Sequence, residues 1–260
     1  MTAAARGGKN GVGYFDFAFH GARIETPNGG VHHVRLNAFA RQNTTERPYA
    51  VVNDFIASTL GVAAGLPVPP GNLIGLYGGG HGFVSMAFGE RGDAAPPVIP
   101  PRFCQERPWE ACGIIAFDQW VSNTDRHDRN LSYIADVGVA VFDHDLALIN
   151  QYHPSGDAAS ALASDLDVEC KSHCLAPHLV DVSFFPEWFD RIASVSRREI
   201  QRTVDICRSA DLVESSLRDV LVDFVVHRQT RVRSYVDRTR LEYKKVSNWT
   251  LDLEGTNGGS

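Results

Sequence analysis

Acidic and amide side chains gather in one stretch near the middle of this 260-residue chain. Asp125 is followed five positions later by Asn130, and Asp143 comes after the largely apolar segment LSYIADVGVAVF. Phosphoryl transfer from a nucleoside triphosphate needs a carboxylate to orient the attacking hydroxyl and oxygen ligands to hold magnesium on the phosphates. The three side chains supply both kinds of group within nineteen positions.

The spacing predicts how these three side chains meet. Residues 131 to 142 are expected to form a hairpin, and because the far ends of two antiparallel strands lie side by side, Asp143 should return to face Asn130. Four residues separate Asp125 from Asn130, the spacing of a kinase catalytic loop. The competing interpretation is that Asp and Asn here serve as ordinary turn residues.

The segment before this loop predicts a small antiparallel sheet with one helix. Strand patterns occur in YFDFAFH, in ARIET after a turn at Gly21, and in VHHVRLNAF after the turn PNGG. A helix is expected from about Pro48 to Gly65, and two more strands in NLIGLY and GFVSMAF. Residues 14–90 are therefore assigned to an amino-terminal lobe.

Most of the rest of the chain is predicted to be helical. Residues 91–107 are rich in Gly and Pro and are expected to be a linker. Residues 108–250 are assigned to a helical lobe that carries the loop, with helices at 108–123, 197–210 and 211–245. Residues 1–13 and 255–260 are expected to be mobile tails. The predicted fold class is α+β with two lobes.

The motif N-T-D-R-H-x-x-N, a hairpin and then F-D-H resembles the HipA-like kinases and, more distantly, the phosphoinositide kinases. The helix ending LGVAAGLPVPP also resembles the HipA-like amino-terminal lobe, so the likeness covers about residues 14 to 150. It implies a bilobal protein-kinase-like fold, ATP and Mg²⁺ as cofactors, and transfer to Ser or Thr of a protein substrate. Asp125 would be the catalytic base, and Asn130 and Asp143 the metal ligands.

Other residues of the motif would support these three. The resemblance implies that Arg126 and His127 brace the loop, with Asp118 and Asp145 nearby in a supporting role.

Two departures from the kinase pattern qualify the resemblance. A strand lysine and a helix glutamate normally form an ion pair at the phosphates, and here Arg35 and Asp54 stand at the expected places. The loop over the phosphates is marked only by Gly21. We expect Arg35, Asp54, Gly21 and Asn130 to contact the nucleotide. A pseudokinase or nucleotide-binding interaction module is one alternative, and a small-molecule or lipid kinase is another.

Composition limits the partners. The formal net charge of −6 provides no basic field for nucleic acid or an anionic membrane, and no apolar run is long enough to cross a bilayer. A cytoplasmic location is expected. The group Cys170, His173, Cys174 and His178 could ligate zinc, but ordinary thiols and imidazoles are preferred. The basic residues from Arg228 to Lys245 are interpreted as a solvated helix face.

Overall fold

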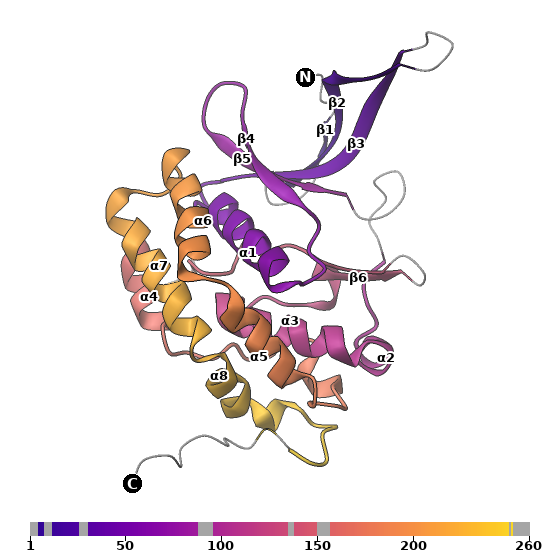
Figure 1. Ribbon diagram of the computed structural model, residues 1–260, viewed down its shortest axis with the longest axis vertical. Coiled ribbons are helices and arrows are strands. Elements are labelled where there is room, and N and C mark those ends of the chain that lie inside the picture. The colour runs from indigo at the N-terminus through magenta and orange to yellow at the C-terminus, as the bar shows by residue number, and fades with distance from the viewer. Residues whose placement is uncertain are drawn as a thin grey trace.

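The computed structural model describes residues 5–7, 12–25, 31–87, 96–134, 138–149, 157–249 and 251, with side chains from Ala38 onward. Five strands form an antiparallel sheet in the order β1-β2-β3-β5-β4. Their bounds are β1 Ala5–Gly7, β2 Val12–Glu25, β3 Val31–Gln42, β4 Gly71–Gly75 and β5 His81–Met86. Figure 1 shows this sheet at one end of the molecule, with most of the helices toward the other end.

Helix α1 (Ala50–Ala64) lies between the sheet and the helical lobe (Figure 1). It contacts β3, β4 and β5 on one side and α5 and α6 on the other. Because both sides are covered, it is apolar nearly all round; Val52, Ile56 and Leu60 are fully buried. The helix ends at Gly65, whose φ of 86° is the left-handed conformation that glycine adopts at little cost.

The helical lobe is built around α3 (Pro108–Val121), which packs against α2, α5, α7 and α8. Its other helices are α2 Pro100–Glu106, α4 Ala158–Asp165, α5 Phe185–Ser194, α6 Arg197–Ser209, α7 Ser215–Gln229 and α8 Val232–Arg238. Trp120 of α3 is fully buried and its indole N–H donates to the Val225 carbonyl at 3.0 Å. A Cβ at Gly113 would lie 2.2 Å from the Trp188 ring, so only glycine lets α3 and α5 approach this closely.

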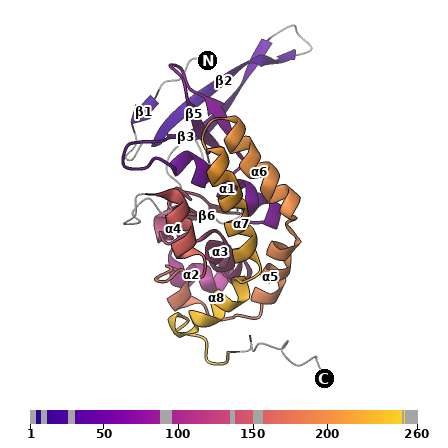
Figure 2. The ribbon, with the colours of Figure 1, turned by 90° about the vertical axis from the view of Figure 1, so that its left-hand side faces the viewer.

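A short hairpin interrupts the helical lobe between α3 and α4. Strands β6 (Leu131–Ile134) and β7 (Gly138–Val141) pair antiparallel. They lie between α1 and α3, and Figure 2 shows β6 in the same middle layer after a quarter turn. The predicted α+β fold with a small sheet and a mainly helical second part is confirmed.

The structure corrects three local predictions. No turn separates two strands at Gly21: β2 is continuous, with a register shift against β3 between Ala18 and Arg23. The expected linker 91–107 contains α2, which begins with two prolines. The long helix expected over 211–245 is divided into α7 and α8 around Thr230 and Arg231.

The expected mobile tails fall mostly outside the described residues. Within residues 1–13, β1 and the start of β2 are described, and residues 255–260 are not described at all. Among the described residues, no helix combines the length and the apolar character that a membrane span requires.

Candidate active site

The hairpin brings the proposed metal ligands into one neighbourhood. Asn130 ends the 3-10 helix η1 (Asp128–Asn130) that leads into β6, and Phe142 follows β7. The Phe142 N–H donates to the Asn130 carbonyl at 3.2 Å. Asp143 is thus one residue away from a backbone hydrogen bond to Asn130, as expected from a reversing pair of strands.

The loop that carries Asp125 is closed by its two asparagines. The Asn123 side-chain oxygen accepts from the Asp125 N–H at 3.2 Å, and the Asn130 side-chain nitrogen donates to the Asp125 carbonyl at 3.1 Å. Asp125 itself is half-buried. Its carboxylate makes no hydrogen bond or ion pair within the described part of the chain, so it can accept a hydrogen bond from a bound ligand.

A buried ion pair supports this loop from below. Arg126 donates from Nε and Nη2 to the two oxygens of Asp118, at 2.8 and 3.0 Å, and both side chains are 0% exposed. The same guanidinium also donates to the carbonyls of Asn130 and Phe142 at 3.1 and 2.7 Å. One side chain therefore ties α3 to both ends of the hairpin.

Further partners fix the Asp118 carboxylate. Asn123 donates to one oxygen at 3.0 Å, and the His173 ring nitrogen lies 3.0 Å from the other. Burial alone would raise the pKa of Asp118, but the charge of Arg126 and the hydrogen bonds from Arg126 and His173 outweigh it and hold that pKa well below its usual value. Asp118 is therefore ionised at neutral pH.

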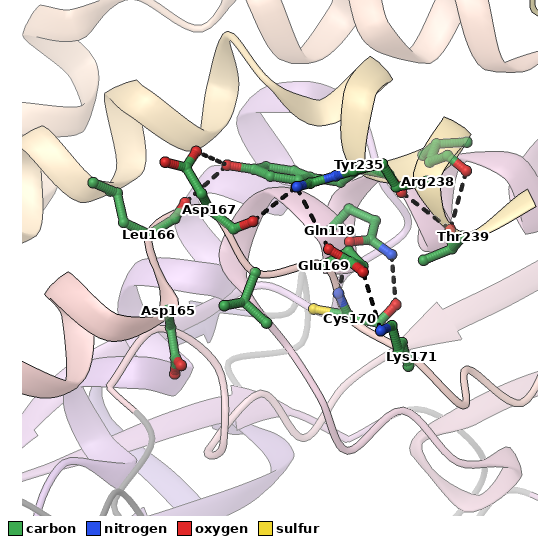
Figure 3. Close-up of polar contacts among 12 residues, drawn as sticks. Gln119, Asp165, Leu166, Asp167, Glu169, Cys170, Lys171, Tyr235, Arg238 and Thr239 are labelled. Carbon is green, nitrogen blue, oxygen red and sulfur yellow. Dashed lines mark hydrogen bonds and ion pairs between the residues drawn. The ribbon is translucent and has the colours of Figure 1, made fainter.

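The segment that supplies His173 is held by α3 and α8. Gln119 and Cys170 exchange two hydrogen bonds, at 2.7 and 2.8 Å. Tyr235 donates to the Leu166 carbonyl and Arg238 to the Asp167 carbonyl, both at 2.8 Å. Figure 3 shows these contacts along the segment.

That segment reaches the catalytic loop as well as α3. The Cys174 N–H donates to the Arg126 carbonyl at 3.2 Å, while the Cys170 thiol contacts the Asp118 carbonyl at 3.4 Å. Cys170, His173 and Cys174 thus serve as supports of the loop.

A second charged cluster lies on the sheet side of the site, around Arg41 of β3. Its Nε lies 2.6 Å from Asp54 of α1, its Nη1 lies 2.6 Å from Asp145, and its Nη2 contacts Asp143. Arg47 also contacts Asp145. Burial raises the pKa of Asp54, Asp143 and Asp145 push it the same way, and Arg41 offsets only part of the effect.

Helix α1 also holds the backbone that follows the hairpin. The Asp54 carboxylate accepts from the His144 N–H at 2.6 Å, and the Asn53 amide donates to the Asp145 and Ile149 carbonyls at 2.8 and 3.1 Å. Asp143 has a φ of 62°, a left-handed conformation that Asp tolerates better than most residues. These contacts keep Asp143 in that conformation.

A cavity of about 240 Å³ opens beside the Arg41 cluster. Its charged lining consists of Arg41, Asp54, Arg129 and Asp143. Apolar lining from the sheet and from the loop after α1 includes Val68, Phe83 and Met86. An apolar slot that ends at charged groups suits a ligand with an apolar body and an ionic end.

The structure places the remaining predicted residues differently from the sequence pattern. Asp54 pairs with Arg41, where Arg35 was expected; Arg35 lies six residues earlier on β3, roughly 20 Å along the strand. The backbone of Arg35 lies opposite Ala18, and its side chain is outside the described set. Gly21 lies in the register-shifted part of β2, and a phosphate contact there stays a prediction.

The donor set fits magnesium. Asp143 offers a carboxylate that is 34% exposed at the cavity. The Asn130 side chain turns its nitrogen toward the Asp125 carbonyl, which leaves its oxygen for a ligand. Mg²⁺ takes one or two such oxygens from a protein and the rest from phosphates and water. Among the described residues, no group of three or more His, Cys, Asp or Glu side chains is arranged to hold a metal ion.

Comparison with solved structures places this architecture among kinase folds. The chain is similar to a proinflammatory kinase of Helicobacter pylori, CtkA, with a TM-score of 0.55 and 10% identity over 94% of this chain and 95% of that one. It also matches HipA of Shewanella oneidensis MR-1, solved with HipB and operator DNA, with a TM-score of 0.45 and 12% identity over 94% and 68%. The likeness to CtkA confirms the predicted kinase-like fold.

No family model matches the chain, and no curated protein matches it either. At this level of identity the likeness concerns the fold, and the chemistry must be argued from the site.

Proposed function

We propose that the protein is an ATP- and Mg²⁺-dependent kinase that transfers the γ-phosphate to a hydroxyl group, with Ser or Thr of a protein as the acceptor. The observation that carries the proposal is the hydrogen bond between Phe142 and Asn130, which brings Asp143, a residue of the cavity lining, beside Asn130. A carboxylate and a carboxamide in this relation, with Asp125 in the same closed loop, are the groups that phosphoryl transfer uses.

In this proposal Asp125 is the residue that orients the acceptor hydroxyl. Its carboxylate has no competing partner among the described residues, and its backbone is fixed on both sides by Asn123 and Asn130. A positioned carboxylate of this kind contributes about 10²- to 10⁴-fold to rate. Arg126 would act through the backbone, because its hydrogen bonds among the described residues go to Asp118 and to carbonyl oxygens.

Asn130 and Asp143 would hold the metal. A bound Mg²⁺ neutralises charge on the phosphates and orients them for in-line transfer. Arg41 now occupies one oxygen of Asp143, so the carboxylate must exchange this partner, wholly or in part, when the metal binds.

Arg41 and Asp54 would replace the lysine and glutamate of other kinases. They come from the equivalent elements, a sheet strand and the helix after it, and form an ion pair at 2.6 Å beside the cavity. An arginine carries a fixed charge and a planar fork suited to phosphate or carboxylate. The sequence pattern had assigned this role to Arg35.

A second candidate, a nucleotide-binding pseudokinase, is favoured by the same arginine. Arg41 contacts three carboxylates, including the metal ligand Asp143. If this cluster does not open, the site binds nucleotide without assembling the metal ligands. The cytoplasmic location and the protein acceptor remain predictions.

Radiolabelled phosphate transfer from ATP distinguishes the two candidates. Wild type should incorporate label with Mg²⁺ and lose it with EDTA, while Asp125→Ala and Asp143→Ala should each lower the rate by at least about 10²-fold. Asp205→Ala, on the exposed face of α6, is the control and should match wild type. Equal incorporation by all four proteins would remove the catalytic assignment, and ATP binding without transfer in wild type would favour the pseudokinase.

A further inference from the structure

The two arginines at the cavity differ in what they already bind. Arg41 is buried and shared among Asp54, Asp143 and Asp145. Arg129 also lines the cavity but is exposed, and within the described part of the chain its guanidinium makes no hydrogen bond or ion pair. The cavity thus has one cation whose charge is already balanced and one whose charge is not.

The backbone that carries Arg129 is fixed although its side chain is not. Arg129 is the middle residue of η1, and its N–H donates to the His127 ring at 3.2 Å. The next residue, Asn130, is 3% exposed and bound to the Asp125 carbonyl. The backbone of Arg129 is therefore fixed next to a proposed metal ligand, while its side chain, at the edge of the cavity, can still rotate.

Charge balance indicates what such a group would bind. A triphosphate brings more negative charge than one divalent ion neutralises, and Arg41 cannot supply the difference while three carboxylates surround it. A guanidinium forms bidentate, charge-assisted hydrogen bonds to phosphate oxygens. Arg129 and Asp143 line the cavity together, and Arg129 directly precedes Asn130 in η1, so its guanidinium lies on the side where the proposed chemistry places the transferred phosphate.

We propose that the Arg129 guanidinium binds the terminal phosphate of the triphosphate and so makes the site prefer ATP to ADP. This inference rests on the proposed function for the identity of the ligand. It differs from the role of Arg41, which organises the carboxylates, and from those of Asn130 and Asp143, which hold the metal.

The test is calorimetric binding of ATP and of ADP, each with Mg²⁺, to wild type, Arg129→Ala, Arg129→Lys and Arg202→Ala. Arg202 is an exposed arginine of α6, away from the cavity, and serves as the matched control. Loss of one charge-assisted contact should raise the Kd for ATP about tenfold in Arg129→Ala, with the Kd for ADP changed by less than about twofold. Arg129→Lys should fall between wild type and Arg129→Ala, and Arg202→Ala should match wild type.

Each other outcome is informative. Equal weakening of ATP and ADP binding in Arg129→Ala would overturn the inference, because the positive charge of Arg129 would then act on both nucleotides alike. No weakening of either nucleotide would overturn it as well. If the wild-type protein transfers phosphate and Arg129→Ala keeps the same preference for ATP over ADP, this inference is overturned and the kinase proposal stays in place. If Arg129→Ala loses the ATP preference but the wild-type protein transfers no phosphate, the contact of Arg129 with the terminal phosphate is supported and kinase activity is rejected.

Discussion

Two charged clusters support the proposed site, and they are built in opposite ways. Beneath the loop, Asp118 and Arg126 form a one-to-one pair with no exposed surface, and every contact adds a hydrogen bond to the pair. On the sheet side, three carboxylates share Arg41, and Asp143 is partly exposed. In the first cluster each charged group already has its partner and is closed off from solvent. In the second, carboxylates outnumber the guanidinium that they share, and one of them reaches solvent.

This difference separates support from chemistry. A saturated, buried pair fixes the loop backbone but cannot bind a ligand without breaking. A shared cation beside an excess of carboxylates can release one of them to a metal ion at little cost. The loop is thus held by the first cluster, and the second can change partners as the site fills.

The largest expected effect comes from breaking the buried pair. Asp118→Asn removes the charge and leaves the Arg126 guanidinium buried without its anion, which should cost about 3–5 kcal/mol in the free energy of unfolding at pH 7. The control is Asp205→Asn, because Asp205 accepts from Arg218 at 2.9 and 3.0 Å in a similar two-point geometry at the surface. That change should cost less than about 1 kcal/mol. Urea unfolding measures both.

The pH dependence of the same variant sharpens the assignment. Because the pKa of Asp118 is held below its unfolded value, its stabilisation is complete above about pH 3.9 and is lost as the pH falls further. The stability difference between wild type and Asp118→Asn should therefore be constant from pH 7 to 5 and shrink below pH 4. A difference that grows on acidification would contradict an ionised Asp118.

The sequence alone located the loop and the three carboxylates of the sheet-side cluster, and it missed Arg41, the arginine that they share. Asp125, Asn130 and the hairpin follow from spacing, since a short antiparallel ribbon returns to its start regardless of what surrounds it. Arg35 and Arg41 are six positions apart, so a period of two gives both the same face of β3. Which of the two arginines pairs with Asp54 depends on the part of β3 against which α1 packs. That packing is tertiary structure, which the local sequence pattern does not specify.

Arg228 shows a second limit of the sequence. It was grouped with a solvated basic face, yet it is 0% exposed and donates to the carbonyls of Gln119, Trp120, Asp165 and Val168. Its neighbours in sequence are polar, and nothing local marks it as buried. The carbonyls that it satisfies come from chain segments 60 to 109 residues away.

An intermediate effect is expected when the shared cation is removed. Arg41→Met frees Asp143 from its guanidinium, so binding of Mn²⁺ without nucleotide, followed by electron paramagnetic resonance, should tighten several-fold. Arg218→Met is the control, because Arg218 also pairs with carboxylates, those of Asp205 and Asp219, and none of these three residues lines the cavity. Tighter binding in both variants, or in neither, would contradict an exchangeable Asp143.

The smallest expected effect concerns His144, which lies between Asp143 and Asp145 but joins neither cluster. Its ring is fully buried, packs edge-on against Phe117 at 5.7 Å, and both ring nitrogens lack a hydrogen-bond partner among the described residues. Burial lowers the pKa of His144 to about 3, so the ring is neutral at pH 7.

A buried polar ring without partners loses its hydration and gains nothing in return, so an apolar ring of similar shape should be preferred. His144→Phe should therefore raise the free energy of unfolding by about 1 kcal/mol at pH 7, measured by urea unfolding. His144→Ala is the matched variant and should lower it by about 2 kcal/mol or more, because it leaves a cavity against Phe117. Destabilisation by both would mean that the imidazole has a polar partner in solution, and His144 would then belong with the charged cluster of Arg41.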